Sequence, residues 1–143
     1  MAFVSNILST KSAVIYSITP DQTVYRGLEM MVEKNIGALL VMEGDTLQGI
    51  FSEREYARNV MLKGKSSRET NISDIMITDI IIVTPETSVD DCMRLMSSKF
   101  IRHLPVLKGE KVVGIISIGD VVKSVIEDQK FIIENMEHYI AGT

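Results

Sequence analysis

A sequence repeat at an offset of 65 residues most limits the folds open to this chain of 143 residues. Between residues 18 and 58, adding 65 to each number keeps the pattern without a gap, and 12 of the 41 aligned positions are identical. Each copy reads as strand, helix, strand, strand, helix, from the spacing of its apolar residues and its turn glycine. One such unit of about 60 residues buries little surface alone, so two copies are expected to pack through their sheets around a pseudo-twofold axis.

The repeat divides the chain into four predicted segments. The first repeat with its lead-in covers 1–63, a polar linker almost without apolar anchors covers 64–73, and the second repeat covers 74–126. Residues 127–143 form a helical tail. The predicted fold class is α/β (α+β), with two small repeats and a C-terminal amphipathic helix.

Composition excludes several classes of function. A net charge of −4 argues against non-specific nucleic-acid binding, which depends on neutralised phosphates. The longest apolar runs are too short to span a bilayer, and the first residues lack the features of a signal peptide. The single cysteine, Cys92, cannot form an internal disulfide, and with two histidines it makes no metal-ligand cluster. We therefore expect a cytoplasmic protein without a metal site.

Both repeats contain a strand that turns directly into a helix, at Ser52 and at Ser117. Three residues later stand Glu55 and Asp120, and Ser-x-x-acid before an apolar helix is a capping box in any fold. The same turn is also an anion site, because the N–H groups at a helix N-terminus point outward. From the motif alone, capping is the stronger interpretation.

The chain resembles the CBS domain pair, or Bateman module, over almost its whole length. The resemblance rests on the repeat itself, on Asp74-Ile75-Met76 at the opening of the second copy, and on Gly114-Ile115-Ile116-Ser117-Ile118-Gly119-Asp120 at its close. Arg102-His103-Leu104-Pro105-Val106 is similar to the small stand-alone members. The resemblance implies a regulatory fold without catalysis that binds AMP foremost, or ADP, ATP, NAD or S-adenosylmethionine, between its repeats. It also implies a homodimer that signals to a regulated protein partner.

The resemblance also implies roles for individual residues. Asp120 would accept the ribose hydroxyls, while Ser117 and the exposed N–H groups of Ile118 and Gly119 would bind anions. Phosphate would lie near basic side chains, and adenine in a slot lined by apolar ones. The predicted nucleotide-binding residues are Lys11, Ile15, Tyr16, Arg54, Ile80, Ile81, Arg102, His103, Pro105, Ser117, Ile118, Gly119 and Asp120.

Two positions depart from the family pattern. Glu55 stands where the family has aspartate, which leaves the first-repeat site open between capping and binding. Ile77 stands where a threonine is common, so a hydroxyl contact is lost. Arg102 and His103 could alternatively be ordinary surface residues at a strand entry.

The tail carries an apolar stripe that includes Phe131, Ile133 and Met136. We expect this stripe to pack across a homodimer interface, with packing back onto the chain's own module as the alternative. Two other functions stay open: a structural dimerisation module with empty clefts, and an enzyme. The enzyme is disfavoured because the sequence has no Walker loop, metal-ligand cluster or nucleophile–base pair.

Overall fold

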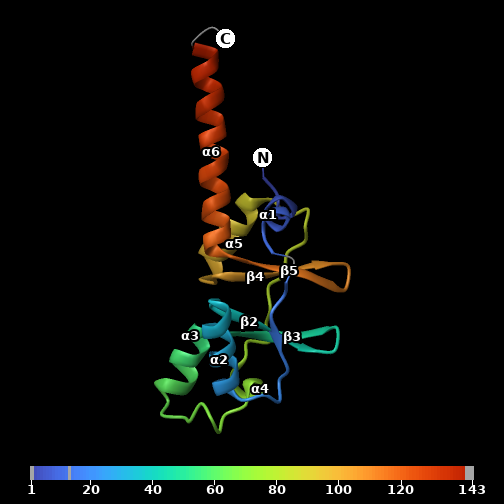
Figure 1. Ribbon diagram of the computed structural model, residues 1–143, viewed down its shortest axis with the longest axis vertical. Coiled ribbons are helices and arrows are strands. Elements are labelled where there is room, and N and C mark those ends of the chain that lie inside the picture. Colours follow the sequence, from blue (N-terminus) through green and yellow to red (C-terminus); the bar gives the residue numbers. More distant parts are fainter. Residues whose placement is uncertain (1, 13, 141–143) are drawn as a thin grey trace. The chain divides into compact units, whose positions relative to one another are not determined.

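The computed structural model describes residues 2–12 and 14–140, apart from the side chain of Tyr139. The chain forms two compact units. The terminal unit combines Met1–Val14 with Ile82–Thr143, and the middle unit is Ile15–Ile81 (Figure 1). Each unit holds one copy of the repeat, which confirms the mixed α/β class predicted from the sequence.

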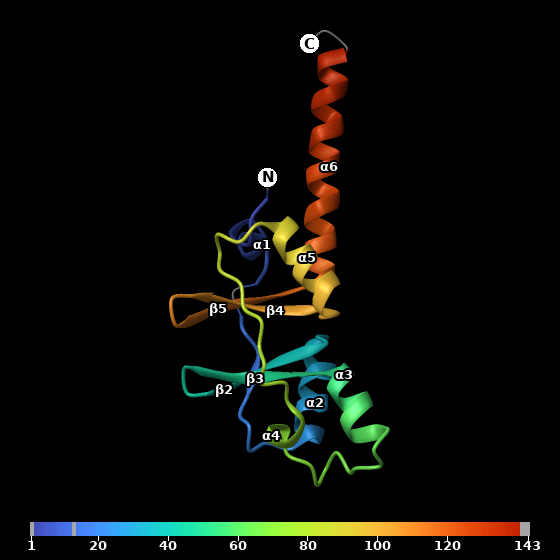
Figure 2. The ribbon, with the colours of Figure 1, turned by 180° about the vertical axis from the view of Figure 1, so that it is seen from behind.

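The middle unit is built on a three-stranded sheet of order β1-β2-β3. β1 (Ser17–Ile18) runs parallel to β2 (Ala38–Glu43), and β3 (Thr46–Ser52) returns antiparallel to β2. Helices α2 (Val24–Lys34) and α3 (Glu53–Tyr56) lie on one side of the β2–β3 hairpin (Figure 2). A π-helical segment, η1 (Ala57–Met61), continues α3, and α4 (Ile72–Ile75) follows. The buried core comprises Ile18, Val24, Met31, Leu39, Val41, Phe51, Val60, Ile72 and Ile75.

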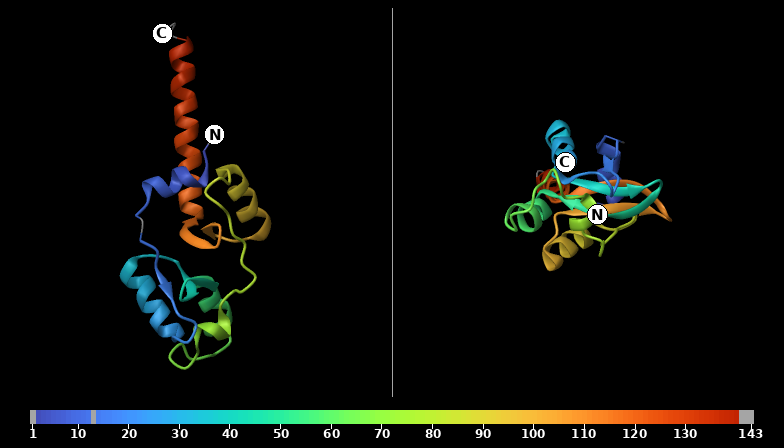
Figure 3. Two further views of the ribbon diagram at one scale, coloured as in Figure 1. Left: turned by 90° about the vertical axis from the view of Figure 1, so that its right-hand side faces the viewer. Right: turned by 90° about the horizontal axis from the view of Figure 1, so that it is seen from below.

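The terminal unit repeats this plan with a smaller sheet. β4 (His103–Lys108) and β5 (Lys111–Ser117) form an antiparallel hairpin, and Val83 makes a single parallel bridge to Val106 in the place that β1 occupies in the middle unit. Its helices are α1 (Val4–Thr10), α5 (Val89–Lys99) and α6 (Ile118–Ile140). Figure 3 shows α1 and α5 on either side of the base of α6, and both contact it.

Local sequence explains where these elements begin and end. Thr23 and Ser88 cap α2 and α5, each accepting a backbone N–H three residues on. Both helices end on a residue in the left-handed region, Asn35 or Phe100. The predicted helices and hairpins are therefore confirmed in both repeats, although η1 gives the second helix of the middle unit a wider turn.

The expectation that residues 64–73 lack apolar anchors is wrong. Ile72 is fully buried in the core of the middle unit, and α4 begins there. Further upstream, the carbonyl of Thr70 accepts the N–H of Val24, the first residue of α2. A single apolar residue, carried on one helical turn, therefore fixes this segment to the first repeat.

The lead-in and the linker play matching parts in opposite units. In the terminal unit the N–H of Val4 donates to the carbonyl of Thr87 at 2.9 Å. In the middle unit the N–H of Ile72 donates to the carbonyl of Gln22, also at 2.9 Å. Since 22 + 65 = 87, both acceptors hold the same place in the repeat. Each repeat is thus completed by the segment that precedes the other one in the chain.

Helix α6 passes through the predicted boundary between the second repeat and the tail without a break. It runs for 23 residues, and from Phe131 onward every side chain that the structure describes is exposed. The predicted packing of this stripe across a homodimer interface stays a prediction.

Candidate functional site

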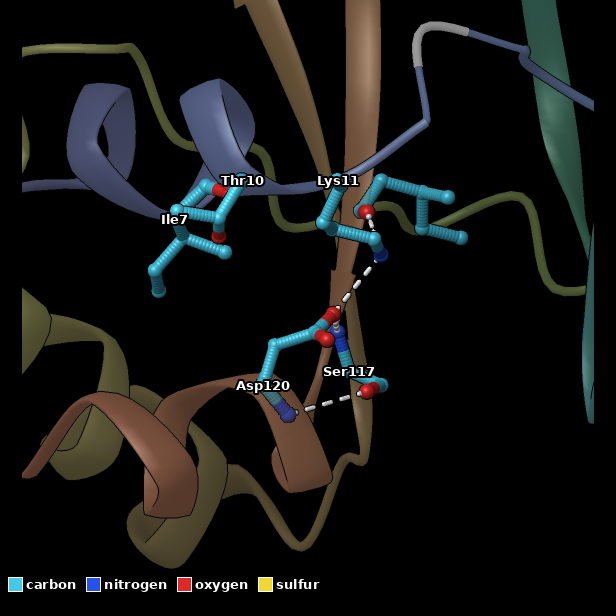
Figure 4. A network of polar contacts seen from close by, with 6 residues as sticks. Ile7, Thr10, Lys11, Ser117 and Asp120 are labelled. Carbon is cyan, nitrogen blue, oxygen red and sulfur yellow. Dashed lines mark hydrogen bonds and ion pairs between the residues drawn. The ribbon is translucent and has the colours of Figure 1, made fainter. Parts of the chain in front are cut away.

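Asp120, in the first turn of α6, is the centre of a polar cluster in the terminal unit (Figure 4). Its Oδ2 accepts the backbone N–H of Ser117 at 2.8 Å and the Lys11 ammonium at 2.7 Å. The N–H of Asp120 donates to Oγ of Ser117 at 3.2 Å, which completes a capping box. Lys11 also donates to the carbonyl of Ile115 at 2.8 Å. Capping and an ion pair therefore hold this carboxylate in place.

Three separate elements bring these side chains together. β5 ends at Ser117 and α6 begins at the next residue, so the strand-to-helix turn fixes Ser117 and Asp120. α1 ends at Thr10, and Lys11 follows it at the C-cap. His103 begins β4 directly opposite Ser117 in the ladder. The structure thus unites four of the predicted site residues from three distant parts of the sequence.

The charges in this cluster are unevenly titrated. Burial acts to raise the pKa of Asp120, but hydrogen bonds from Lys11 and from the N–H of Ser117 outweigh it, and the pKa is lowered from its ordinary value. The pKa of His103 is also lowered, first by burial and then by the nearby charge of Lys11, while Asp120 acts in the opposite direction. At neutral pH the site therefore presents an ionised carboxylate beside a neutral imidazole.

The prediction that Ile118 offers a free N–H to an anion is wrong. That N–H donates to the carbonyl of Arg102 at 2.8 Å, because the chain entering β4 passes beside the start of α6. The N–H of Gly119 is the donor that the described contacts of this turn do not use. A Cβ at Gly119 would have Oγ of Ser117 as its nearest neighbour, at 3.6 Å, so the backbone here is open to a ligand.

The equivalent turn of the middle unit is closed. Glu55 is 5% exposed, and its Oε1 accepts both the hydroxyl of Ser52 at 2.6 Å and its N–H at 3.0 Å. Ile72 and Val4 match each other at an offset of 68, and the same offset places Asp79 where the terminal unit has Lys11. The interpretation of Ser52 and Glu55 as a capping box is therefore confirmed, without a cation beside it.

The remaining predicted residues lie outside the polar cluster. Arg102 is exposed and, with Ile118 and Gly119, lines an open groove of about 710 Å³ along the first half of α6. Pro105 is buried within β4, where its carbonyl accepts the N–H of Val83. The others belong to the middle unit and stay predictions: Ile15, Tyr16, Arg54, Ile80 and Ile81.

Sequence reasoning placed Lys11 near phosphate and did not foresee its ion pair with Asp120. It also missed Lys123 in the groove beside Arg102, although a lysine three residues after Asp120 is a signal for the same helix face. Cys92 is a core residue as predicted: it is fully buried, and burial raises the pKa of its thiol to about 11.

Replacing Lys11 with methionine is expected to lower the free energy of unfolding by about 1–2 kcal/mol at pH 7, because a half-buried carboxylate loses a charged donor. The lowered pKa of Asp120 stabilises the fold above the unfolded carboxyl value of about 3.9 and ceases to do so as the pH falls through the folded value. The gap between native and variant should therefore close below about pH 4. Urea unfolding at pH 7 and pH 3 measures it, and Lys123→Met is the control for lost positive charge. Equal effects of the two variants would contradict the ion pair's role.

Within the residues that the structure describes, no cluster of His, Cys, Asp or Glu has the makings of a metal site. Over the same residues, none of the helices combines the length and apolar character that a membrane crossing requires.

Comparison with known proteins identifies both repeats. The family model of the CBS domain matches residues 4–61 and 72–127. A mitochondrial CBS domain-containing protein of Arabidopsis thaliana is 41% identical over 129 residues, which cover 87% of this chain and 63% of that protein. The chain thus spans less than two thirds of that relative. A CBS domain-containing protein of Bacillus subtilis is 29% identical over 116 residues, covering 81% of this chain and 82% of its own.

Solved structures share the fold. A CBS-domain protein from Burkholderia ambifaria has 48% identity and a TM-score of 0.86, covering 90% of this chain and 96% of its own. The CBS domain pair of a further protein, solved with 5′-methylthioadenosine and S-adenosylmethionine, has 22% identity and a TM-score of 0.79, with coverages of 90% and 98%. That second likeness concerns the fold alone.

Proposed function

Because this chain belongs to the CBS-domain family and carries two copies of the domain, we propose that it is a regulatory module whose terminal unit binds an adenosine-containing ligand through Asp120. The ribose diol would donate to the carboxylate, and the binding free energy would shift the conformational equilibrium that a regulated partner reads. No catalytic step is part of this proposal.

The state of Asp120 is the observation that carries the proposal. Its lowered pKa keeps the carboxylate ionised, and both of its protein contacts fall on Oδ2. Among the described contacts Oδ1 has no partner, so it is available to accept a hydroxyl. Gly119 leaves room next to it for a ligand to approach the backbone.

The phosphate end of the ligand has candidate partners on the same turn. Arg102 and Lys123 line the groove that begins at Ile118 and Gly119, and the N–H of Gly119 lies at the start of α6, where an anion is favoured. His103, neutral in the free protein, would gain a proton beside a phosphate and add a donor. These groups suit AMP best, with ADP, ATP and NAD as longer ligands of the same kind.

Among structural neighbours, the pair solved with 5′-methylthioadenosine and S-adenosylmethionine supports an adenosine-containing ligand class without naming the ligand of this chain. We also propose a homodimer formed through α6, whose exposed apolar side chains include Phe131 at 63% and Met136 at 58%. The alternative function, a structural dimerisation module, is favoured by the capping bonds of Asp120, which serve the helix without any ligand. A cytoplasmic location stays a prediction.

Calorimetric titration with AMP, ATP, NAD and S-adenosylmethionine tests the proposal. We expect micromolar binding of at least one compound to the native chain, and a loss of about tenfold or more in Asp120→Asn, which keeps the shape of the side chain but removes its charge. The matched control is Glu55→Gln, the equivalent change in the closed turn of the middle unit, which should bind normally. Absence of heat with all four compounds, with no shift in Tm, would support the structural module instead.

A further inference from the structure

The exposed face of α6 follows a strict seven-residue repeat, typical of a helix that packs along another helix. Its central row is Val122, Gln129 and Met136, and the two flanking rows are Ile118, Val125 and Ile132 on one side and Ile126, Ile133 and Ile140 on the other. Gln129 is the one polar member. Three adjacent rows make a face broader than a two-row seam needs, and most of it is exposed in the terminal unit.

Two hollows lie along this face, one in each half of the helix. The first is the groove beside Arg102, lined among others by Ile118, Val122 and Ile126. The second, of about 310 Å³, is lined by Ile132, Asn135, Met136 and Ile140. Figure 1 shows that the second half of α6 extends beyond the other elements of the terminal unit, so that no neighbour within the unit covers it.

Reversing the helix about Gln129 exchanges the two hollows. Ile118 and Ile140 each lie 11 residues from Gln129, and Val122 and Met136 each lie 7 residues from it. Ile126 and Ile132 are each 3 residues away, and Lys123 and Asn135 each 6. Every residue that lines the second hollow therefore has its counterpart in the first. A second copy of α6, running in the opposite direction, would place like hollows and ridges against each other.

Charge supports the same direction. The groove of the first half carries Arg102, Lys123 and Lys130 with one acidic residue, whereas the second half ends with Glu134 and Glu137. In an antiparallel pair Lys123 of each chain lies near Glu137 of the other, because 129 − 123 = 6 and 137 − 129 = 8. In a parallel pair the two acidic ends would lie together, and so would the two basic ends.

We infer that α6 pairs antiparallel with α6 of a second copy of this chain, with Gln129 on the twofold axis. This inference rests on the proposed homodimer and fixes its direction and register. Val122 then faces Met136 of the second copy at both ends, and the two Gln129 amides meet at the centre, where each can donate to the other. A single polar pair at the axis also penalises any shift in register, since a slipped helix would bury the amide without a partner.

Cysteine cross-linking tests the direction. Chains carrying Val122→Cys and Met136→Cys, given different tags and co-expressed, should form a mixed disulfide on mild oxidation. Each variant expressed alone should not, because its own cysteines lie at opposite ends of an antiparallel pair. The native chain is the control, since its only thiol, Cys92, is fully buried. A disulfide between two Val122→Cys chains would overturn the antiparallel arrangement and leave the homodimer standing.

Charge reversal gives a second readout on the free side chains. Lys123→Glu and Glu137→Lys should each weaken the dimer about threefold or more, and a chain with both changes should recover it. Within one helix the two residues are 14 apart, about 21 Å, so they cannot rescue each other in a parallel pair. A native chain that is monomeric by light scattering would overturn both the dimer and its direction, while the nucleotide titration reports on Asp120 independently.

Discussion

Ile72→Ala is expected to lower the free energy of unfolding of the middle unit by about 2–5 kcal/mol. Ile72 is fully buried, and its Cδ1 would lie 3.1 Å from a Cβ added at Gly27 on α2, so the contact between α4 and α2 is close. Truncation removes the single apolar side chain by which the end of the predicted linker enters this core. The surrounding backbone is held by hydrogen bonds to Pro20 and Gln22 and cannot collapse freely into the cavity.

Urea unfolding followed by circular dichroism measures this loss, and Ile77→Ala is its matched control. Ile77 lies five residues further along the same segment and is 40% exposed, so its truncation should cost several-fold less. Similar losses in the two variants would mean that the segment around α4 is peripheral, contrary to its place in the core.

Gly49→Ala is expected to cost about 3 kcal/mol, at the upper end of the range for inserting one methyl group into a packed site. A Cβ at Gly49 would stand 2.6 Å from the carbonyl oxygen of Ile77. That oxygen accepts the N–H of Ile50 at 3.0 Å, and the N–H of Ile77 donates back to Ile50 at 2.9 Å. The methyl group cannot be accommodated without separating the two backbones, which loses both hydrogen bonds.

Gly114 is the same position in the second repeat and supplies the control, since 49 + 65 = 114. A Cβ at Gly114 would meet Cδ2 of Leu8 at 2.7 Å, and this is the end of a side chain that can turn away. Gly114→Ala should therefore cost clearly less than Gly49→Ala in the same denaturation experiment. The reverse order would show that the exchange of segments is tighter in the terminal unit.

Much of the fold could be predicted because its elements are encoded locally and twice. The helical spacing that begins at Val24 and at Val89, and the turn glycines Gly44 and Gly109, specify their elements within a few residues. Repetition at a constant offset then confirmed each assignment by an independent copy. The strand-to-helix turn before Asp120 was visible for the same reason.

What could not be predicted depends on contacts between distant segments. The N–H of Ile118 was expected to be free, but Arg102 accepts it from 16 residues upstream. Lys11 reaches Asp120 across 109 residues, and nothing in the lead-in sequence signals that it belongs with the second repeat. The burial of Ile72 is likewise invisible in a polar stretch, because one apolar residue makes no period.

The exchange of segments between the repeats also sets an order for folding during synthesis. The middle unit is one continuous stretch, so all of its parts exist once Ile81 has been made. The terminal unit needs Met1–Val14 together with β5 and α6, across the whole of that stretch. The earliest residues to leave the ribosome, with Val4 and Ile7 still exposed to solvent, must therefore wait for the latest ones. Once folded, the middle unit shortens that wait, because it replaces a flexible loop with a compact body and lowers the entropic cost of closing it.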